Sequence, residues 1–286
     1  MASIKELYFF AKKELKELDS PEFDAMCLAE EFLHADRNRL YLHGEERANA
    51  SDEEKFRQAV EKRKGFYPLQ YILGYWYFRD MKLKVRDGVL CPREDTEVLV
   101  NESLERIKEI YGNKAVFGVD LCSGTGCVAL GISRESENIS MDAVELFDTP
   151  YECLCENIAE WGIDRVKISR GDVFSDECLE KYHGLDFLTA NPPYISEDEM
   201  ETLQAEVQKE PREALTDGGD GLAFYRRIIK DWKKTVKIGG FIALEIGETQ
   251  AEAVKSLFEA NGFGDVCVKK DFGELDRCVS AIKLSD

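Results

Sequence analysis

The sequence has few histidines and no long apolar run, and each shortage excludes a class of protein. Three histidines and nine cysteines without a C-x-x-C pair indicate neither a zinc site nor a disulfide framework. The N-terminal residues contain no apolar stretch long enough for a signal peptide or a membrane helix. We therefore expect a cytoplasmic protein with reduced thiols, no metal site and no membrane association.

Basic residues are also scarce relative to acidic ones. The chain of 286 residues holds 38 Lys and Arg against 57 Asp and Glu, which gives a net charge of −19. Because nucleic-acid binding draws much of its affinity from basic side chains on phosphates, we expect no direct nucleic-acid partner. An acidic surface suits basic protein partners or small ligands, and it also serves solubility alone. The length accommodates a main domain and a smaller one.

Residues 1–67 have the spacing of apolar residues that is typical of helices. Ser3 is the candidate N-cap of a first helix, and Ser20-Pro21 predicts the start of a second. Ser51 with Glu54 forms a capping-box pattern for another helix. We predict a small N-terminal helical domain over residues 1–67 that docks a partner.

The pattern changes at residue 68. Two short alternating stretches, at Tyr75–Phe78 and Lys82–Val85, are separated by the turn residues Arg79-Asp80 and predict a β-hairpin. We place this hairpin in a linker over residues 68–91 and expect the larger domain over residues 92–286.

After Gly112, apolar runs alternate with helical patterns. This alternation predicts an α/β fold with a doubly wound, Rossmann-like and mainly parallel sheet. Two closing runs, at Val266–Val268 and Val279–Ile282, predict an antiparallel C-terminal hairpin. The other predicted strands are Val116–Leu121, Ile139–Val144, Val166–Ser169, Phe187–Ala190 and Gly240–Leu244.

A glycine-rich segment leaves the first of these strands and opens a helix over Cys127–Arg134. Glycine lets a ligand approach the backbone closely, and a helix N-terminus favours an anionic group. Glu145 ends the second strand, where a carboxylate can accept both hydroxyls of a ribose. Asp172 is placed to accept from an adenine amino group, and Val173 to cover the ring. The predicted cofactor contacts are Asp120, Cys122, Ser123, Gly124, Thr125, Gly126, Glu145, Asp172 and Val173.

The segment Asn191-Pro192-Pro193-Tyr194 leaves the strand that ends at Ala190, where open α/β sheets place their ligands. The Asn191 carboxamide can accept a hydrogen bond from an incoming N–H. The prolines stiffen the loop and leave its carbonyls free to accept as well. Tyr194 adds an aromatic face. Acceptors of this kind would hold a planar NH2 group with its lone pair turned toward an electrophile.

The glycine loop alone leaves two cofactors open. Gly124-x-Gly126-x-x-Ala129 also satisfies the fingerprint of a dinucleotide-binding enzyme. A nicotinamide enzyme has no use for Asn-Pro-Pro-Tyr, whereas S-adenosylmethionine could place its carboxylate at the glycine loop and its methyl group near Asn191. The two loops together predict a methyltransferase that also uses Asn191 in its cofactor pocket and releases S-adenosylhomocysteine.

The chain resembles the HemK/PrmC family of protein-(glutamine-N5) methyltransferases over nearly its whole length. This resemblance implies a class I methyltransferase that modifies the glutamine of the Gly-Gly-Gln motif in class I peptide chain release factors. We also expect a monomer. The matching segments are Pro68–Gly74, Pro92-Arg93, Thr96-Glu97, Asp120–Gly126, Asn191–Ile195, Glu210-Pro211, Ala214-Leu215, Gly218–Leu222, Leu244–Gly247 and Gln250.

By position, the resemblance also implies roles for residues. Cys122–Gly126, Glu145 and Val173 would bind the cofactor, whereas Asn191 and the Pro192 carbonyl would hold the substrate amide as the catalytic pair. Pro193 and Tyr194 would complete the substrate site. The chain departs from the family where Val173 replaces a frequent aromatic residue, where Glu145 replaces Asp, and where Arg93-Glu94-Asp95 replaces Arg-Pro-Glu or Arg-Pro-Asp.

Three further hypotheses stay open. The same four residues serve nucleic-acid adenine or cytosine amino-methyltransferases, although the acidic charge counts against such a substrate. A non-catalytic protein that binds release factors is the other alternative. The polar stretch from Glu206 to Leu222, before a helix expected over Leu222–Val236, is either a lid with hinges at Gly218, Gly219 and Gly221 or an ordinary exposed loop.

Overall fold

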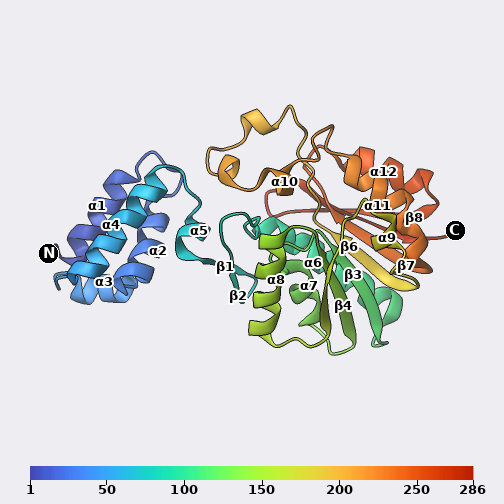
Figure 1. The fold of residues 1–286 in the computed structure, drawn as a ribbon, viewed down its shortest axis with the longest axis horizontal. Coiled ribbons are helices and arrows are strands. Elements are labelled where there is room, and N and C mark those ends of the chain that lie inside the picture. Colours follow the sequence, from blue (N-terminus) through green and yellow to red (C-terminus); the bar gives the residue numbers. More distant parts are fainter. Residues whose placement is uncertain (286) are drawn as a thin grey trace. The chain divides into compact units, whose positions relative to one another are not determined.

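The computed structural model describes residues 1–285, and these form two compact units (Figure 1). The helical unit comprises Met1–Tyr75 together with Gln204–Lys209. The sheet unit comprises Trp76–Leu203 and the chain from Glu210 onward. These limits differ from the sequence-based division at residues 67 and 91. The short helix at residues 69–73 packs on two of the preceding helices, and residues 204–209 also join the helical unit. No helix within residues 1–285 is long and apolar enough to cross a membrane.

The helical unit begins as its sequence predicts. The Ser3 hydroxyl accepts from the backbone N–H of Glu6 at 3.2 Å, and the Glu6 carboxylate accepts from the backbone N–H of Ser3 at 2.8 Å. This capping box starts the first helix. Leu7, Leu28 and Phe56 are buried between the helices. The helices are α1 Ile4–Glu14, α2 Pro21–Leu33, α3 Arg37–His43, α4 Ala50–Lys64 and α5 Leu69–Leu73.

One predicted cap is wrong, and another is confirmed in position but makes no capping hydrogen bond. Asn49 rather than Ser51 caps α4, because its side chain accepts from the backbone N–H of Asp52 at 2.9 Å and the helix starts one residue after it. Ser20 does precede α2, with Pro21 in the first turn, but its side chain makes no capping hydrogen bond. Its ψ of 60° is not the extended conformation that a capping side chain needs.

A buried ion pair holds the remote segment in the helical unit. The Arg63 Nε donates to Asp24 Oδ2 at 2.6 Å, and both side chains are almost fully buried. The same guanidinium pairs with Glu206 at 2.5 Å and donates to the Tyr67 carbonyl at 3.2 Å. Residues 204–209 are therefore fastened to the helices, although the chain on both sides of them belongs to the sheet unit.

The predicted hairpin is confirmed as β1 Tyr75–Phe78 paired with β2 Met81–Lys84. The predicted sheet is confirmed as well. Its strand order is β5-β4-β3-β6-β7-β9-β8, with parallel pairing from β5 to β7 and antiparallel pairing for β9 with both neighbours. The strands are β3 Val116–Leu121, β4 Ile139–Glu145, β5 Val166–Arg170, β6 Leu185–Ala190, β7 Val236–Glu245, β8 Phe263–Lys270 and β9 Asp276–Lys283.

Helices cover both faces of this sheet and bury two apolar clusters (Figure 1). Leu188 and Ile242 belong to the cluster under α9, α11 and α12, whereas Phe187 and Phe241 belong to the cluster under α6, α7 and α8. Successive side chains alternate between faces, so both faces of β6 and of the carboxyl half of β7 are buried. The helices are α6 Glu97–Tyr111, α7 Cys127–Ser133, α8 Asp148–Trp161, α9 Asp176–Leu179, α10 Arg212–Leu215, α11 Ala223–Lys230 and α12 Ala251–Ala260.

Short 3-10 turns complete the fold. The helix expected over Leu222–Val236 is shorter, because α11 ends at Lys230 and a 3-10 turn follows it. In this turn, the indole N–H of Trp232 donates to the Val173 carbonyl. The other turns are η1 Glu94–Thr96, η2 Met200–Thr202 and η3 Val207–Lys209, with η4 at Trp232–Thr235.

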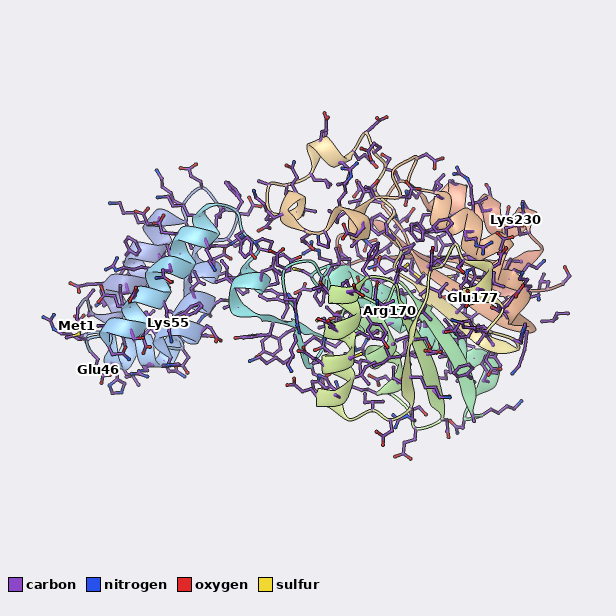
Figure 2. All side chains as sticks on the ribbon, viewed as in Figure 1. Met1, Glu46, Lys55, Arg170, Glu177 and Lys230 are labelled. Atoms are coloured by element: carbon purple, nitrogen blue, oxygen red, sulfur yellow. The ribbon has the colours of Figure 1, made fainter. Side chains whose placement is uncertain are left out.

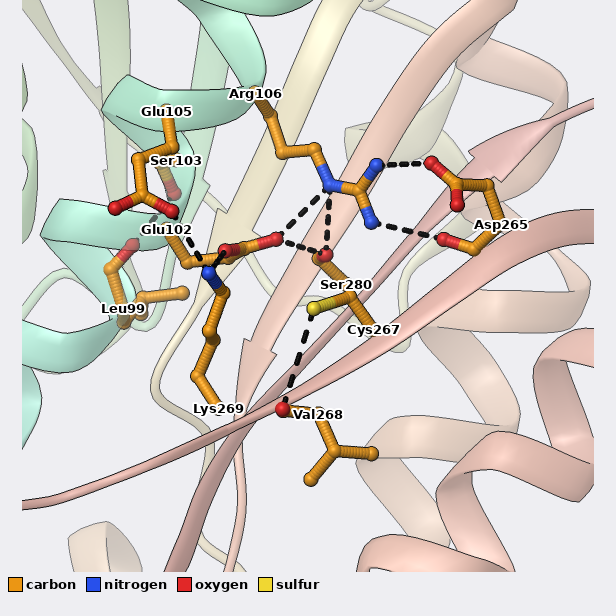
Figure 3. A network of polar contacts seen from close by, with 10 residues as sticks. All are labelled: Leu99, Glu102, Ser103, Glu105, Arg106, Asp265, Cys267, Val268, Lys269 and Ser280. Atoms are coloured by element: carbon orange, nitrogen blue, oxygen red, sulfur yellow. Dashed lines mark hydrogen bonds and ion pairs between the residues drawn. The ribbon is translucent and has the colours of Figure 1, made fainter.

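Charged side chains of both signs project from each unit into solvent (Figure 2). The labelled residues Glu46, Lys55, Arg170, Glu177 and Lys230 are all exposed. One group of charges is centred on the buried side chains of Glu102 and Arg106, between α6 and the C-terminal hairpin, with the exposed Asp265 at its rim (Figure 3).

In this buried group, Arg106 donates from Nε to Glu102 Oε1 at 2.9 Å and to Ser280 Oγ at 3.1 Å. Arg106 also pairs with the Asp265 carboxylate and donates to its carbonyl at 2.8 Å, and Lys269 pairs with Glu102 at 3.2 Å (Figure 3). The network ties β8 and β9 to α6, so it fixes the edge of the sheet that lies farthest from β5.

Candidate active site

A cavity of about 380 Å³ lies in the sheet unit at the carboxyl ends of β3 to β6. It brings together ten of the thirteen residues that the sequence analysis singled out. The lining does not include Gly126, Pro192 or Tyr194. The ten are Asp120, Cys122, Ser123, Gly124, Thr125, Glu145, Asp172, Val173, Asn191 and Pro193.

The glycine loop after β3 is a tight turn with an open outer side. Cys122 and Gly124 have φ values of 58° and 53°, and nothing lies within 4 Å of where a Cβ of Gly124 would be. Gly126 has a different task. A Cβ there would lie 2.5 Å from Leu154 Cδ1, so this glycine lets α7 begin close to α8 rather than contacting a ligand.

Glu145 ends β4 and is fixed by three backbone N–H groups. Its Oε1 accepts from Leu146 at 2.7 Å and from Phe147 at 3.0 Å, and its Oε2 accepts from Gly124 at 2.9 Å. The side chain is buried and lines the cavity. Each carboxylate oxygen has two lone-pair directions, so Oε2 keeps one of them for a ligand hydroxyl beside these bonds.

Asp120 is a buried acceptor at the end of β3. Its Oδ1 accepts from the Thr189 hydroxyl of β6 at 2.8 Å, whereas its Oδ2 is buried without a hydrogen-bond partner. Burial raises the pKa of Asp120 to about 7, against the hydrogen bonds from Thr189 and Ser123. An unpaired carboxylate oxygen in a cavity wall suits a cationic or N–H donor.

Aromatic side chains missed by the sequence analysis form the wall after β5. Asp172 Oδ1 accepts from the backbone N–H of Phe174 at 2.8 Å, which turns the chain there. Val173 is buried in the lining, and Phe174 meets Phe224 of α11 edge-on with ring centroids 4.8 Å apart. Phe147 also lines the cavity. Val173 stands where an aromatic residue is frequent in the HemK/PrmC family, and here the next residue, Phe174, supplies an aromatic ring to the cavity wall.

Asn191 lines the cavity and has a buried acceptor without a partner. Its Nδ2 donates to Thr96 Oγ1 at 3.3 Å, and its Oδ1 is buried without a hydrogen-bond partner. Pro193 also lines the cavity. Tyr194 turns elsewhere, because its hydroxyl donates to Glu245 Oε1 at 3.3 Å and its carbonyl accepts from Gln250 Nε2 at 2.8 Å.

Glu245, at the end of β7, is a further buried carboxyl group next to this loop. Burial raises its pKa to about 7, while hydrogen bonds from Thr96 and Tyr194 and the charge of Arg277 act in the opposite direction. Its Oε2 has no hydrogen-bond partner. The sequence analysis gave Thr96 and Glu245 no role, and both lie in segments that it singled out.

The chain after residue 209 returns to the cavity and is held there. Glu210 is buried, pairs with Arg93 and accepts from the backbone N–H of Cys91 at 3.0 Å. Asp217 accepts from the backbone N–H groups of Gly219, Gly221 and Ala223 at 2.8 to 3.0 Å. A Cβ on Gly221 would collide with the Tyr194 carbonyl, so Gly221 permits a close approach. The lid itself stays a prediction.

Comparison with known proteins agrees with this architecture. The PrmC N-terminal domain family matches residues 6–74, and the methyltransferase small domain family matches residues 96–233. A release factor glutamine methyltransferase of Clostridium botulinum is 37% identical over 269 residues, 93% of each chain. One of Thermodesulfovibrio yellowstonii is 39% identical over 248 residues, 86% of each chain. A methyltransferase structure from Pyrococcus furiosus gives a TM-score of 0.52 at 14% identity over 73% of this chain and 91% of that one, and so shows the fold alone.

The sheet order, the glycine loop after β3 and the cavity at the strand ends define an enzyme of the class I methyltransferase fold. Within that class, the chain belongs to the family of release factor glutamine methyltransferases, which use S-adenosylmethionine.

Proposed function

We propose that this protein transfers a methyl group from S-adenosylmethionine to the side-chain amide nitrogen of the glutamine in the Gly-Gly-Gln motif of class I peptide chain release factors. The observation that carries the proposal is the buried, unpartnered Oδ1 of Asn191, a residue that lines the same cavity as the glycine loop and Glu145. The names of relatives that align with this chain over most of their length, 93% for the one of Clostridium botulinum, support the choice of substrate.

The residues present fit the cofactor. Asp120 Oδ2 is an orphaned buried acceptor for its ammonium group, and the open side of Gly124 leaves room for its methionyl part. Glu145 would take the ribose hydroxyls, Asp172 the adenine amino group, and Val173 with Phe174 the faces of the ring. Cys122, Ser123 and Thr125 complete this wall. When bound, S-adenosylmethionine supplies an electrophilic methyl group on a sulfonium.

The protein's own contribution to the reaction is positioning. An amide nitrogen has its lone pair delocalised into the carbonyl, so it attacks only when it is held in line and shielded from water. Asn191 Oδ1 and the Pro192 carbonyl would each accept one N–H of the glutamine amide and turn the nitrogen toward the methyl group. Alignment of this kind can lower the barrier by about 7–11 kcal/mol at best.

No side-chain base is required at the transfer step. The bound cofactor would supply the methyl group, with the new carbon–nitrogen bond replacing the carbon–sulfur bond. The nitrogen would then carry a positive charge that makes its proton very acidic, and water would take this proton. The buried acceptor Oδ1 of Asn191 would favour the positive charge as it develops on the substrate nitrogen.

The rest of the chain would serve the partner. The helical domain at residues 1–67 would dock the release factor, and the chain would act as a monomer in the cytoplasm. The match of residues 6–74 to the PrmC N-terminal domain supports this division of labour. A nucleic-acid substrate is disfavoured by the net charge of −19, and a purely docking protein would have no use for the orphaned acceptors.

Mass spectrometry of a purified class I release factor, after incubation with this protein and S-adenosylmethionine, tests the proposal. We expect one added methyl group on the glutamine of Gly-Gly-Gln, absent with Asn191→Ala and retained with the exposed control Lys230→Ala. If no methyl group is added although the cofactor binds, the substrate is wrong. An oligonucleotide offered in parallel with tritiated cofactor identifies the alternative.

A further inference from the structure

We infer that Thr96 and Glu245 are positioning residues that fix which end of the Asn191 amide faces the substrate. The inference rests on the proposed function, since it names the residues that make Asn191 an acceptor. Thr96 is 1% exposed and Glu245 is 2% exposed, so neither is there to contact solvent. Of these three side chains, Thr96 and Asn191 line the cavity and Glu245 does not, so Glu245 would act through the other two.

Three separate elements bring these side chains together. Thr96 is the last residue of η1, Asn191 follows the end of β6, and Glu245 is the last residue of β7. The parallel register places Ala190 opposite Leu244, so Asn191 and Glu245 each come directly after a paired residue. The Asn191 Nδ2 donates to Thr96 Oγ1 at 3.3 Å. The Thr96 hydroxyl lies close enough to Glu245 to act, by hydrogen bonding, against the rise in the pKa of that carboxyl group.

The direction of these hydrogen bonds follows from the donors that are available. A threonine hydroxyl has one proton, and an ionised carboxylate can only accept. With Glu245 ionised, the proton of Thr96 points to Glu245, and the Thr96 lone pairs must take an N–H of Asn191. The amide therefore turns its NH2 toward Thr96 and leaves Oδ1 in the cavity, where it has no protein partner.

The opposite amide orientation would disable the site. It would present the NH2 of Asn191 to the NH2 of a substrate glutamine, and two donors cannot hydrogen-bond to each other. An asparagine by itself has no strong preference between its two ends, so the choice has to come from its neighbours. Tyr194 supports the arrangement, because its hydroxyl donates to Glu245 Oε1 at 3.3 Å and helps to keep that carboxylate an acceptor.

The test compares an amide ligand, which offers an N–H donor to Asn191, with a carboxylate ligand, which only accepts and carries a negative charge. The effect of the charge alone is common to wild type and variant, so the change in preference between them is the readout. Release factors carrying Gly-Gly-Gln or Gly-Gly-Glu are titrated, in the presence of S-adenosylhomocysteine, into the wild-type protein and into Thr96→Val. The wild type should favour the glutamine form. Thr96→Val removes both hydrogen bonds of the hydroxyl and lets the amide turn its donor toward the carboxylate, so we expect the preference for glutamine to fall about tenfold or more.

Three companion variants separate positioning from mere support of the fold. Thr96→Ser keeps the hydroxyl and should restore the wild-type preference. Glu245→Gln can donate to Thr96 and reverse the direction of the bonds, so it should shift the preference as Thr96→Val does, even if Thr96→Val does not fold. Thr235→Val is the matched control, because it also removes a fully buried hydroxyl, which donates to the Trp232 carbonyl at 2.8 Å.

The outcomes are distinct. An unchanged glutamine preference in Glu245→Gln and in Thr96→Val overturns the inference, whatever happens to their turnover or melting temperature. The proposed function fails separately, if the wild-type protein adds no methyl group to the Gly-Gly-Gln release factor. The expected turnover of Thr96→Val, relative to folded protein, is about tenfold or more below wild type, with the affinity for S-adenosylhomocysteine unchanged.

Discussion

Two buried polar clusters of the sheet unit have opposite hydrogen-bonding patterns. In the cluster between α6 and the C-terminal hairpin, Arg106 binds Glu102, Ser280 and Asp265, and Lys269 adds a second positive charge (Figure 3). In the cluster at the strand ends, the acceptors are left incomplete. Within residues 1–285, six buried side-chain atoms have no hydrogen-bond partner, and three of them are Asp120 Oδ2, Asn191 Oδ1 and Glu245 Oε2.

This difference distinguishes a site that stabilises from a site that binds. A buried polar atom without a partner costs about 1–3 kcal/mol, so the cluster at the strand ends lowers the stability of the protein. Asp120 and Asn191 line the cavity, where a ligand can complete their hydrogen bonds. The cluster around Arg106 lines no part of that cavity and supports the edge of the sheet instead.

The largest effect on stability is expected from breaking the cluster around Arg106, whose hydrogen bonds are complete. Arg106→Met leaves the carboxylate of Glu102 buried, with Lys269 as its remaining ion-pair partner. Removing one partner of a buried pair typically costs about 3–5 kcal/mol. Urea unfolding should show a loss of this size. The double variant Glu102→Leu with Arg106→Met should be more stable than Arg106→Met alone, and a less stable double variant would contradict the argument.

Removing the unpaired acceptor of Asn191 should have the opposite result, a small loss of stability and a large loss of activity. Asn191→Ala deletes a side chain whose Oδ1 has no partner, so the melting temperature should change little. Turnover should fall about 100- to 1,000-fold, the usual cost of deleting one preorganised hydrogen-bonding group at a reacting centre. Methyl transfer measured per folded molecule gives the ratio. Near-normal turnover in Asn191→Ala would remove Asn191 from the mechanism.

Acidification should weaken the cluster at the strand ends. The pKa of Glu245 is raised to about 7 by burial, so the carboxylate is present above that pH and lost as pH falls through it. The ionised form can only accept, whereas the protonated form can also donate to Thr96 and so reverse the direction of the bond. We therefore expect kcat/KM to fall on the acid side of pH 7, about tenfold per pH unit. The other titratable or charged groups that interact with the Glu245 side chain are Asp95, Cys127, Tyr194, Tyr225, Arg277 and Cys278.

Two variants assign this acid limb. The pKa of Asp120 is also about 7, so the profile of wild-type protein alone does not distinguish the two carboxyl groups. Glu245→Gln should lower kcat/KM and flatten the limb, whereas Asp120→Asn should leave a limb due to Glu245. An acid limb that persists unchanged in Glu245→Gln would rule out the role given to that carboxylate.

The smallest effect concerns the aromatic wall of the cavity. Phe174→Ala removes the edge-on contact with Phe224, worth about 0.5–1.5 kcal/mol beyond buried area. We expect the affinity for S-adenosylhomocysteine to weaken by about 3- to 10-fold, as measured by calorimetry. Phe272→Ala is the control, because Phe272 is 91% exposed and lies outside the cavity lining. Equal affinities in both variants would show that Phe174 does not contact the cofactor.

Much of the fold and part of the site follow from local sequence. The strand from Val116 to Leu121 is predicted to the residue, because a strand buried on both faces is a short apolar run bounded by polar or turn residues. The glycine loop and the Asn191 loop each follow such a run. Since carboxyl ends of parallel strands share one edge of a sheet, their meeting in one cavity is also predictable.

Other features were decided only by the tertiary structure. Hydrogen bonds from Asn191 to Thr96, and from Thr96 and Tyr194 to Glu245, depend on the register of β6 with β7 and on where η1 ends. The sequence does not show which side-chain atoms end without a partner, because that depends on every neighbour of the atom. Residues 204–209 join the helices for the same reason: Glu206 meets the buried Arg63, which lies 143 positions earlier in the chain.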